Sequence, residues 1–366
     1  MSDATAWYSD KALLGSLVAC AFALVTVAVS IFHIRHHLTH YNEPKAQRYT
    51  IRILLMVPVY AVNSAISLFT YKTIGSFIVT TLRDCYEAYT LYNFFALCLC
   101  YCGGPNLLVT RWQSDDARLP VSWWTMTCCL SELKLDGAFL RMVRQGTLQF
   151  VIMKLVLAAV ALGLRIAGVY DEGHFRPDRG YVYVTVIYNT SIFLALYSLV
   201  LFYLSARVYL APFKPLAKFA LVKTIIFVTF WQNVLIAILF LVGVAKPLDG
   251  LDATASVVFI QNFLLCVESL PIALLNIVGF PAPVRDGKIS NVCHSLKHFV
   301  QMNDVLLDTA TTFDPTYKEF LFVNQDDSPV GDPSASPLPS TSKPPEIQIT
   351  LMNESQLRSD DNANAK

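Results

Sequence analysis

The sequence carries little charge for its length. Only 15% of its 366 residues are Asp, Glu, Lys or Arg, whereas 54% are hydrophobic and the mean hydropathy is +0.47. A soluble globular domain carries about 25% charged residues, so this composition excludes an ordinary soluble domain and predicts a polytopic membrane protein. The net charge of +1 lacks the basic excess of nucleic-acid-binding proteins, so we expect no nucleic-acid partner.

The sequence also lacks the local patterns of common enzymes. It contains no Gly-rich phosphate loop, no nucleophile elbow and no convincing set of metal ligands. His33/His37 and His36/His40 have the four-residue spacing of a helical metal pair, but only Glu43 follows as a third ligand. We therefore predict that the protein is not an enzyme, holds no metal, and continues through the His-rich stretch as a solvated helix extension.

Seven apolar runs each exceed the roughly 17 residues that cross a bilayer. We therefore predict an all-α membrane protein with seven transmembrane helices. The first run is too long for a signal peptide and lacks a small-residue cleavage site, so we expect a signal anchor. The seven runs are Ala12–Phe32, Ile51–Phe69, Ile74–Tyr101, Leu148–Val169, Tyr181–Tyr203, Ala220–Val244 and Ser256–Val278.

Lys and Arg are concentrated in alternate connections between these runs. The positive-inside rule then predicts an extracellular or luminal N-terminus and a cytosolic C-terminus. The expected parts are a luminal N-terminus (1–11), a membrane domain (12–278) with a cytosolic loop (103–146), a cytosolic amphipathic segment (279–324) and a disordered tail rich in Ser, Pro and Asp (325–366).

The predicted luminal segments contain no cysteine, which excludes a luminal disulfide framework under this topology. Cys98, Cys100 and Cys102 instead lie where the third run meets the cytosol. Membrane-proximal cytosolic cysteines are candidates for palmitoylation, and the alternative is that they are small apolar fillers.

The third run contains three ionisable residues, Arg83, Asp84 and Glu87. Each costs roughly 2.5–3.5 kcal/mol at the centre of a membrane helix, so they must face protein or water and neutralise one another. Arg83 and Glu87 are four residues apart and can pair on one helix face. Two interpretations stay open: a functional site, or an ion pair that serves only helix packing.

Other polar residues lie at similar depth and suggest a polar interior. Glu268 is near the middle of the last run, and we expect Arg83 as its partner. Asp84, Glu87 and Glu268 outnumber Arg83 among these interior residues, which favours a cation or a basic group as the ligand. Arg83 alone can hold an anionic headgroup. The predicted ligand-binding residues are Asn63, Arg83, Asp84, Glu87, Asn93, Gln232 and Glu268.

Three further expectations concern single residues. Pro58 should kink the second helix because it frees a backbone carbonyl. Lys154 should snorkel towards one end of the fourth helix. Trp112 should lie in the headgroup zone.

The segment after the last run has apolar residues at roughly helical spacing. It can lie along the membrane or bind a partner. The predicted partner-binding residues are Leu296, Phe299, Leu306 and Tyr317.

Motifs along most of the membrane domain resemble the family of organic solute transporter subunit alpha and transmembrane protein 184. Asn63 and Ser269 depart from the pattern of the second branch, which tends to carry Asp and Met there. The matching residues are His37-Leu38, Tyr41, Pro44, Gln47-Arg48, Ile51–Tyr60, Arg83–Tyr89, Tyr92, Phe94, Gly146–Gln149, Lys218-Phe219, Lys223, Phe230–Gln232, Cys266–Glu268, Asp304, Asp308, Phe313, Pro315 and Tyr317.

The resemblance implies seven helices with the N-terminus outside, and a lipidated cysteine cluster at the place of Cys98, Cys100 and Cys102. Members act as facilitative carriers of steroid-like solutes, or as endosomal or vacuolar proteins that recruit trafficking and autophagy partners. The implied associates are membrane lipids, an amphipathic organic solute, a bound lipid or sterol, palmitoyl groups, and a second copy or a small single-span helper subunit. The location implied is an endosomal, vacuolar or plasma membrane.

We therefore predict a facilitative carrier of amphipathic, steroid- or lipid-like solutes. The alternative is a non-transporting scaffold that acts through the cytosolic segment. A heptahelical receptor ranks last, because the sequence lacks a luminal cysteine pair.

Overall fold

The computed structural model describes residues 10–40, 43–70, 73–119, 133–170, 180–243, 245, 247–248, 253–282 and 312. The chain divides into two compact units, Met1–Phe322 and Val323–Lys366, and all described residues belong to the first. Of the second unit, and of Leu296, Phe299, Leu306 and Tyr317, nothing is described, so the predictions made for them lie outside the described residues.

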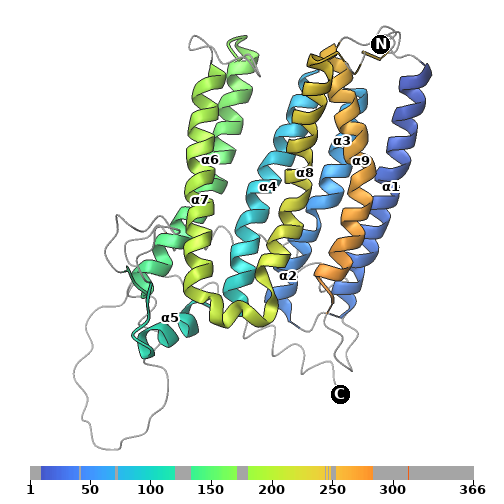
Figure 1. Ribbon diagram of the computed structural model, residues 1–366. Coiled ribbons are helices and arrows are strands. Elements are labelled where there is room, and N and C mark those ends of the chain that lie inside the picture. Colours follow the sequence, from blue (N-terminus) through green and yellow to red (C-terminus); the bar gives the residue numbers. More distant parts are fainter. Residues whose placement is uncertain are drawn as a thin grey trace, which may run out of the picture. The chain divides into compact units, whose positions relative to one another are not determined.

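The described chain is almost entirely helical (Figure 1). Six helical segments are long and apolar enough to cross a membrane, and a seventh span results if α4 and α5, which meet at 56°, count as one. The protein is therefore an all-α membrane protein, as predicted. The elements are α1 (Asp10–Thr39), α2 (Pro44–Leu54), α3 (Met56–Phe69), α4 (Ile74–Tyr101), α5 (Pro105–Ser114), β1 (Arg118–Leu119), β2 (Leu133–Lys134), α6 (Gly137–Ile166), α7 (Gly180–Leu210), η2 (Ala211–Phe213), α8 (Pro215–Leu241) and α9 (Ala253–Gly279).

The second span is broken where the sequence predicts a kink. Helix α2 ends at Leu54, and α3 begins at Met56. Pro58 has no backbone N–H to donate to the carbonyl of Leu54, and its ring crowds that carbonyl, so the helix cannot continue unbroken. The two pieces together still form one membrane-length segment, Pro44–Phe69.

Several helices begin earlier or end later than their apolar runs. Helix α6 starts at Gly137, where Asp136 accepts a hydrogen bond from the N–H of Phe139 at 2.8 Å. Helix α7 continues to Leu210. The polar turns at these ends pack against other helices, which hydropathy alone does not reveal.

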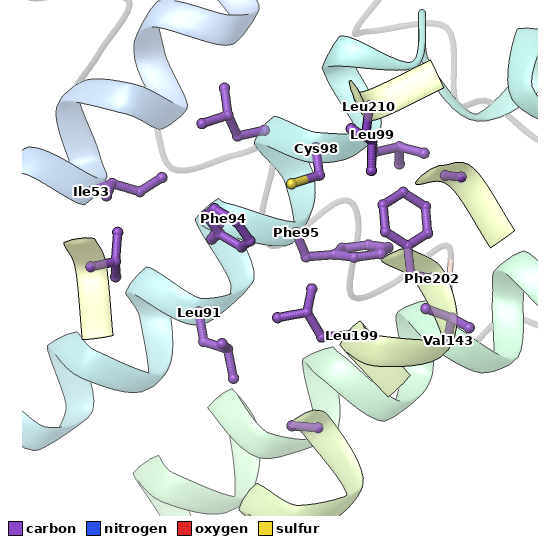
Figure 2. Packing of buried hydrophobic residues seen from close by; sticks show 14 of the residues in the cluster. Ile53, Leu91, Phe94, Phe95, Cys98, Leu99, Val143, Leu199, Phe202 and Leu210 are labelled. Atoms are coloured by element: carbon purple, nitrogen blue, oxygen red, sulfur yellow. The ribbon is translucent and has the colours of Figure 1, made fainter. Parts of the chain in front are cut away.

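Helix α4 lies at the centre of the main apolar core and packs against α2, α3 and α6 (Figure 1). Figure 2 shows side chains of α4 meeting those of α2, α6 and α7 in this core. Phe95 and Phe202 lie edge to face with their centroids 4.9 Å apart. On the other side of the bundle, α9 packs against α1, α3 and α8.

The last turns of α1, α4, α7 and α9 and the first turns of α2, α6 and α8 lie at the same end of the bundle (Figure 1). We call it the basic end, because the connections rich in Lys and Arg leave the helices there. His33 and His37 on α1 both contact the carbonyl oxygen of Phe280, at 3.0 Å each. Both rings are buried, so the expectation of a solvated extension is wrong for this pair. Their Nε2 atoms bind the end of α9 because that carbonyl follows its last turn. Among the described residues, no group of His, Cys, Asp and Glu could hold a metal ion.

The prediction for Trp112 is also wrong. Its side chain is 1% exposed, and its Nε1 donates a hydrogen bond to the carbonyl of Ser205 on α7 at 3.2 Å. The ring also meets Phe139 of α6 edge to face. Helix α5 is therefore fastened to the bundle by a Trp whose ring is covered by protein and does not face lipid headgroups.

Candidate functional site

The candidate site is a group of charged side chains around the middle of α4. We call Arg83, Asp84, Glu87, Lys154 and Lys223 the charge cluster. Helix α4 supplies the first three, α6 supplies Lys154 and α8 supplies Lys223. The group therefore joins three helices that are far apart in sequence.

Asp84 bridges two of the cations. Arg83 donates to its Oδ1 from Nη2 at 3.0 Å and from Nε at 3.2 Å. Lys154 Nζ lies 3.3 Å from Oδ2, and the lysine side chain is only 14% exposed. The expectation that Lys154 snorkels away is thus wrong, because the partly buried carboxylate of Asp84 on α4 offers a closer counter-charge than the membrane surface.

Glu87 forms the second half of the cluster. Its Oε1 lies 3.3 Å from Lys223 Nζ, and its Oε2 accepts a hydrogen bond from the Tyr60 hydroxyl at 3.1 Å. The predicted Arg83–Glu87 pair does not form. Arg83 instead turns to the adjacent Asp84 and lies over the Tyr60 ring, with Cζ 5.0 Å from the centroid.

Two tyrosines from neighbouring helices complete the surroundings of the cluster. Tyr60 comes from α3, and Tyr188 of α7 has its ring centroid 4.1 Å from Lys154 Nζ. An aromatic face attracts a nearby cation through its quadrupole, and this attraction grows when water is excluded. Helices α3, α4, α6, α7 and α8 all contribute side chains to this one site.

The charge balance of the cluster differs from the one expected. Three cations face two carboxylates, so the described groups carry one positive charge in excess. The acidic surplus predicted from the sequence counted Arg83, Asp84, Glu87 and Glu268. It was wrong, because Lys154 and Lys223 are also interior residues and bring these six residues to three positive and three negative charges. The charge cluster itself favours an anionic group rather than a cation.

The structure does not bring Glu268 to Arg83. Gln232 Nε2 on α8 instead donates a hydrogen bond to Glu268 Oε1 on α9. This second polar contact ties the two helices together. Neither of its two residues comes from α4, which carries Arg83.

Asn63 and Asn93 are buried, and neither takes part in the ion pairs of the charge cluster. Asn63 is 3% exposed, and neither polar atom of its side chain has a hydrogen-bond partner among the described residues. Asn93 is fully buried, and its Nδ2 donates to the carbonyl of Tyr89 at 2.7 Å. Their predicted role in ligand binding stays a prediction.

The three cysteines at the end of α4 differ in accessibility. Cys98 and Cys102 are buried, at 3% and 0% exposure, while Cys100 is half-buried. Acylation of a thiol needs access to it, so Cys100 is the accessible candidate of the three in this arrangement. Palmitoylation stays a prediction.

An apolar cavity of about 270 Å³ lies between α4, α7 and α8, towards the basic end from the cluster. Phe94 and Cys98 line it from α4, and Phe219 lines it from α8. Because residues four and seven apart share a helix face, Phe219 is one turn from Lys223 and Phe94 two turns from Glu87. The remaining lining residues are Leu196, Leu199, Val200, Phe202, Tyr203, Leu210, Pro215 and Leu216.

Residues 15–284 match the family model described as organic solute transporter Ostalpha. The chain belongs to this family. The match covers all the membrane helices except the first turn of α1, and the family is one of transporter-type integral membrane proteins rather than of enzymes. The predicted family resemblance is confirmed.

A curated relative points to the second branch of the resemblance. The chain is 36% identical over 247 residues to a transmembrane protein 184 homolog of Dictyostelium discoideum. The aligned part covers 68% of this chain and 48% of the relative, so the chain spans about half the length of that protein. No solved structure matches the chain.

Sequence reasoning missed Lys223, Tyr60 and Tyr188 as members of the site. Lys223 was visible as part of the family pattern, but its partner was not. Lys154 was visible as an ionisable residue in an apolar run, which by itself marks a candidate functional position. No spacing rule links it to Asp84, since the two residues lie 70 positions apart on different helices.

Proposed function

We propose that this protein is a facilitative membrane carrier of amphipathic organic solutes, with a preference for anionic ones. The observation that carries the proposal is the charge cluster, with its excess cation, close to an apolar cavity along the same faces of α4 and α8. A steroid- or lipid-like anion has the matching chemistry, an apolar body and a charged end. Membership of a solute transporter family supports the same function.

The ion pairs also suit a carrier that works downhill. In the empty protein each carboxylate is neutralised by cations, which reduces the cost of charges at this depth. An anionic solute can compete with Asp84 for Lys154 or Arg83. Because Asp84 keeps the other of these two cations, the solute can bind without leaving that carboxylate unpaired.

The test is a flux assay in proteoliposomes that contain the purified full-length protein. The probe is a radiolabelled steroid sulfate, compared with an uncharged steroid and an amphipathic cation. We expect saturable uptake of the anion, with little selectivity for the cation. Arg83→Ala, Glu87→Gln and Lys223→Gln should each abolish flux while the protein still reaches its membrane in cells.

Lys214→Gln is the matched control, because it removes an exposed lysine at the start of α8. It should leave flux unchanged. Flux that is equal in all variants, or absent in the wild type for every probe, would contradict the carrier. In that case the alternative scaffold gains support if truncation of the tail after residue 282 abolishes partner recruitment.

The scaffold depends on a segment that lies mostly outside the described residues. Thr312 is described, and its carbonyl accepts hydrogen bonds from Arg141 at 3.0 Å and Gln145 at 3.1 Å, both on α6. The helper subunit, a second copy, the trafficking partners and the endosomal, vacuolar or plasma-membrane location stay predictions.

A further inference from the structure

A second cavity lies at the basic end and belongs to neither the charge cluster nor the apolar cavity. Its volume is about 450 Å³, within the roughly 300–1,000 Å³ range of small-molecule sites. It is formed by α2, α4, the start of α5, and α6. The lining residues are Lys45, Arg48, Tyr49, Tyr92, Phe95, Ala96, Leu99, Cys100, Gly103, Gly104, Pro105 and Arg144.

Three cationic side chains line this cavity, and no acidic side chain is among its lining residues. Lys45 and Arg48 are three positions apart on α2 and so share one helix face. Arg144 reaches the same cavity from α6 and is only 7% exposed. Arg48 is half-buried and Lys45 is exposed, so the cations extend from the water-facing rim into the interior.

The start of α5 adds partial positive charge to the same wall. Gly103 and Gly104 adopt φ of 90° and 93°, which a residue with a Cβ rarely adopts, and Pro105 then opens the helix. No side chain caps Gly104, and this ten-residue helix begins at the cavity. Backbone N–H groups at a helix N-terminus favour an anion, phosphate above all.

The opposite wall is apolar and comes from α4. Tyr92, Phe95, Ala96 and Leu99 lie on one stripe of the helix, spaced by three or four residues. Tyr92 and Phe95 are almost fully covered, and Ala96 and Leu99 keep 7% and 8% of their surface accessible. Guanidinium groups recognise phosphate through paired hydrogen bonds, while this wall offers a surface for hydrocarbon. The cavity is therefore polar and cationic on one side and apolar on the other.

We propose that this cavity binds a phosphate ester, the headgroup of an anionic phospholipid. Its phosphates contact Arg48, Arg144 and the start of α5, Lys45 covers the rim, and the glycerol and first methylenes lie along α4. A soluble phosphate ester shares the chemistry of the headgroup, so the experiment has to separate the two sources. The proposal stands apart from the carrier function, because none of its residues belongs to the charge cluster.

The experiment is native mass spectrometry of the purified full-length protein in a neutral detergent. The probes are dioctanoyl phosphatidylinositol 4-phosphate, inositol 1,4-bisphosphate as its free headgroup, and dioctanoyl phosphatidylcholine as a zwitterionic lipid of equal chain length. We expect one copy of the phosphoinositide to bind at least tenfold more tightly than either comparison probe. Tight binding of the free headgroup alone would identify a soluble ester and overturn the lipid assignment.

Single substitutions test whether the phosphoinositide binds in this cavity. Arg48→Gln and Arg144→Gln should each weaken binding about ten- to hundred-fold, because each removes a charge-assisted hydrogen bond to phosphate. Lys45→Gln, which changes an exposed side chain and leaves the fold intact, should weaken it several-fold and reduce its salt dependence.

Arg207→Gln is the matched control, since it removes an exposed arginine at the end of α7 outside the cavity. It should bind as the wild type does. If Lys45→Gln and Arg48→Gln both bind the phosphoinositide as tightly as Arg207→Gln does, the site is not this cavity and the proposal fails. Loss of binding in these two variants at an unchanged melting temperature supports it.

Discussion

Lys223→Gln removes the ammonium group that lies 3.3 Å from Glu87 Oε1. The Glu87 side chain is only 13% exposed and then keeps the Tyr60 hydroxyl as its hydrogen-bond donor among the described residues. At 3.3 Å and an effective dielectric constant of 20, Coulomb's law gives about 5 kcal/mol for the pair. Removal of one partner of a fully buried pair costs about 3–5 kcal/mol. This pair is partly buried, so we expect Lys223→Gln to lower the free energy of unfolding by about 2–3 kcal/mol.

A double variant distinguishes the loss of the ion pair from the loss of the other contacts that each side chain makes. Glu87→Gln together with Lys223→Gln leaves two neutral amides that can hydrogen-bond to each other. We expect the double variant to lie within about 1 kcal/mol of the wild type, which makes the coupling free energy at least about 2 kcal/mol.

The assay is the free energy of unfolding from SDS titration in bicelles, followed by tryptophan fluorescence. Lys214→Gln serves as the control for loss of one lysine on α8 and should change stability by less than about 0.5 kcal/mol. Additive effects of the two single substitutions would refute the pairing. A wild-type-like Lys223→Gln would show that Glu87 is solvated or neutral.

Three other outcomes can be checked. Gly146→Ala should destabilise the protein by about 1–3 kcal/mol, because the added Cβ would lie 2.9 Å from the Cβ of Ser198; a further Ser198→Gly should restore stability in the same titration. Asn63→Leu should stabilise the protein by about 1–3 kcal/mol, since both buried polar atoms lack a partner among the described residues, and an unchanged or lower stability would contradict this. In an acyl-exchange assay Cys100→Ser should remove more acylation than Cys98→Ser, because Cys100 is half-buried whereas Cys98 is buried; equal losses would contradict this.

The sequence was sufficient for the features that depend on local chemistry. Helix α4 has the predicted bounds, Ile74–Tyr101, since a polar Thr73 cap and a double glycine enclose its apolar run. The break after Leu54 follows from Pro58, whose missing N–H acts on the carbonyl four residues earlier. In both cases the residues that set the helix end lie within a few positions of it in the sequence.

The pairing of the charges could not be predicted, because it depends on which helices are neighbours. The four-residue spacing allows Arg83 to pair with Glu87, yet Arg83 pairs with the adjacent Asp84. Glu87 pairs instead with Lys223 of α8, which is 136 positions away in the sequence. Lys154 illustrates the same limit. A long lysine side chain can reach water or a carboxylate on a neighbouring helix, and only the packing of α6 on α4 decides between them.

The place of α9 has a consequence for how the protein is made. Helix α9 is the last of the described membrane-length helices to be synthesised. It packs against α1 and α3, and the hydroxyl of Thr26 on α1 meets that of Ser269 across 243 positions at 3.0 Å. At about 5–20 residues per second, the ribosome takes about 12–50 s to supply that partner. During this interval the polar faces of α1 and α3 need a temporary neighbour in the membrane. A truncated chain that ends before Ala253 lacks α9, and we expect membrane-protein quality control to recognise it as incompletely assembled.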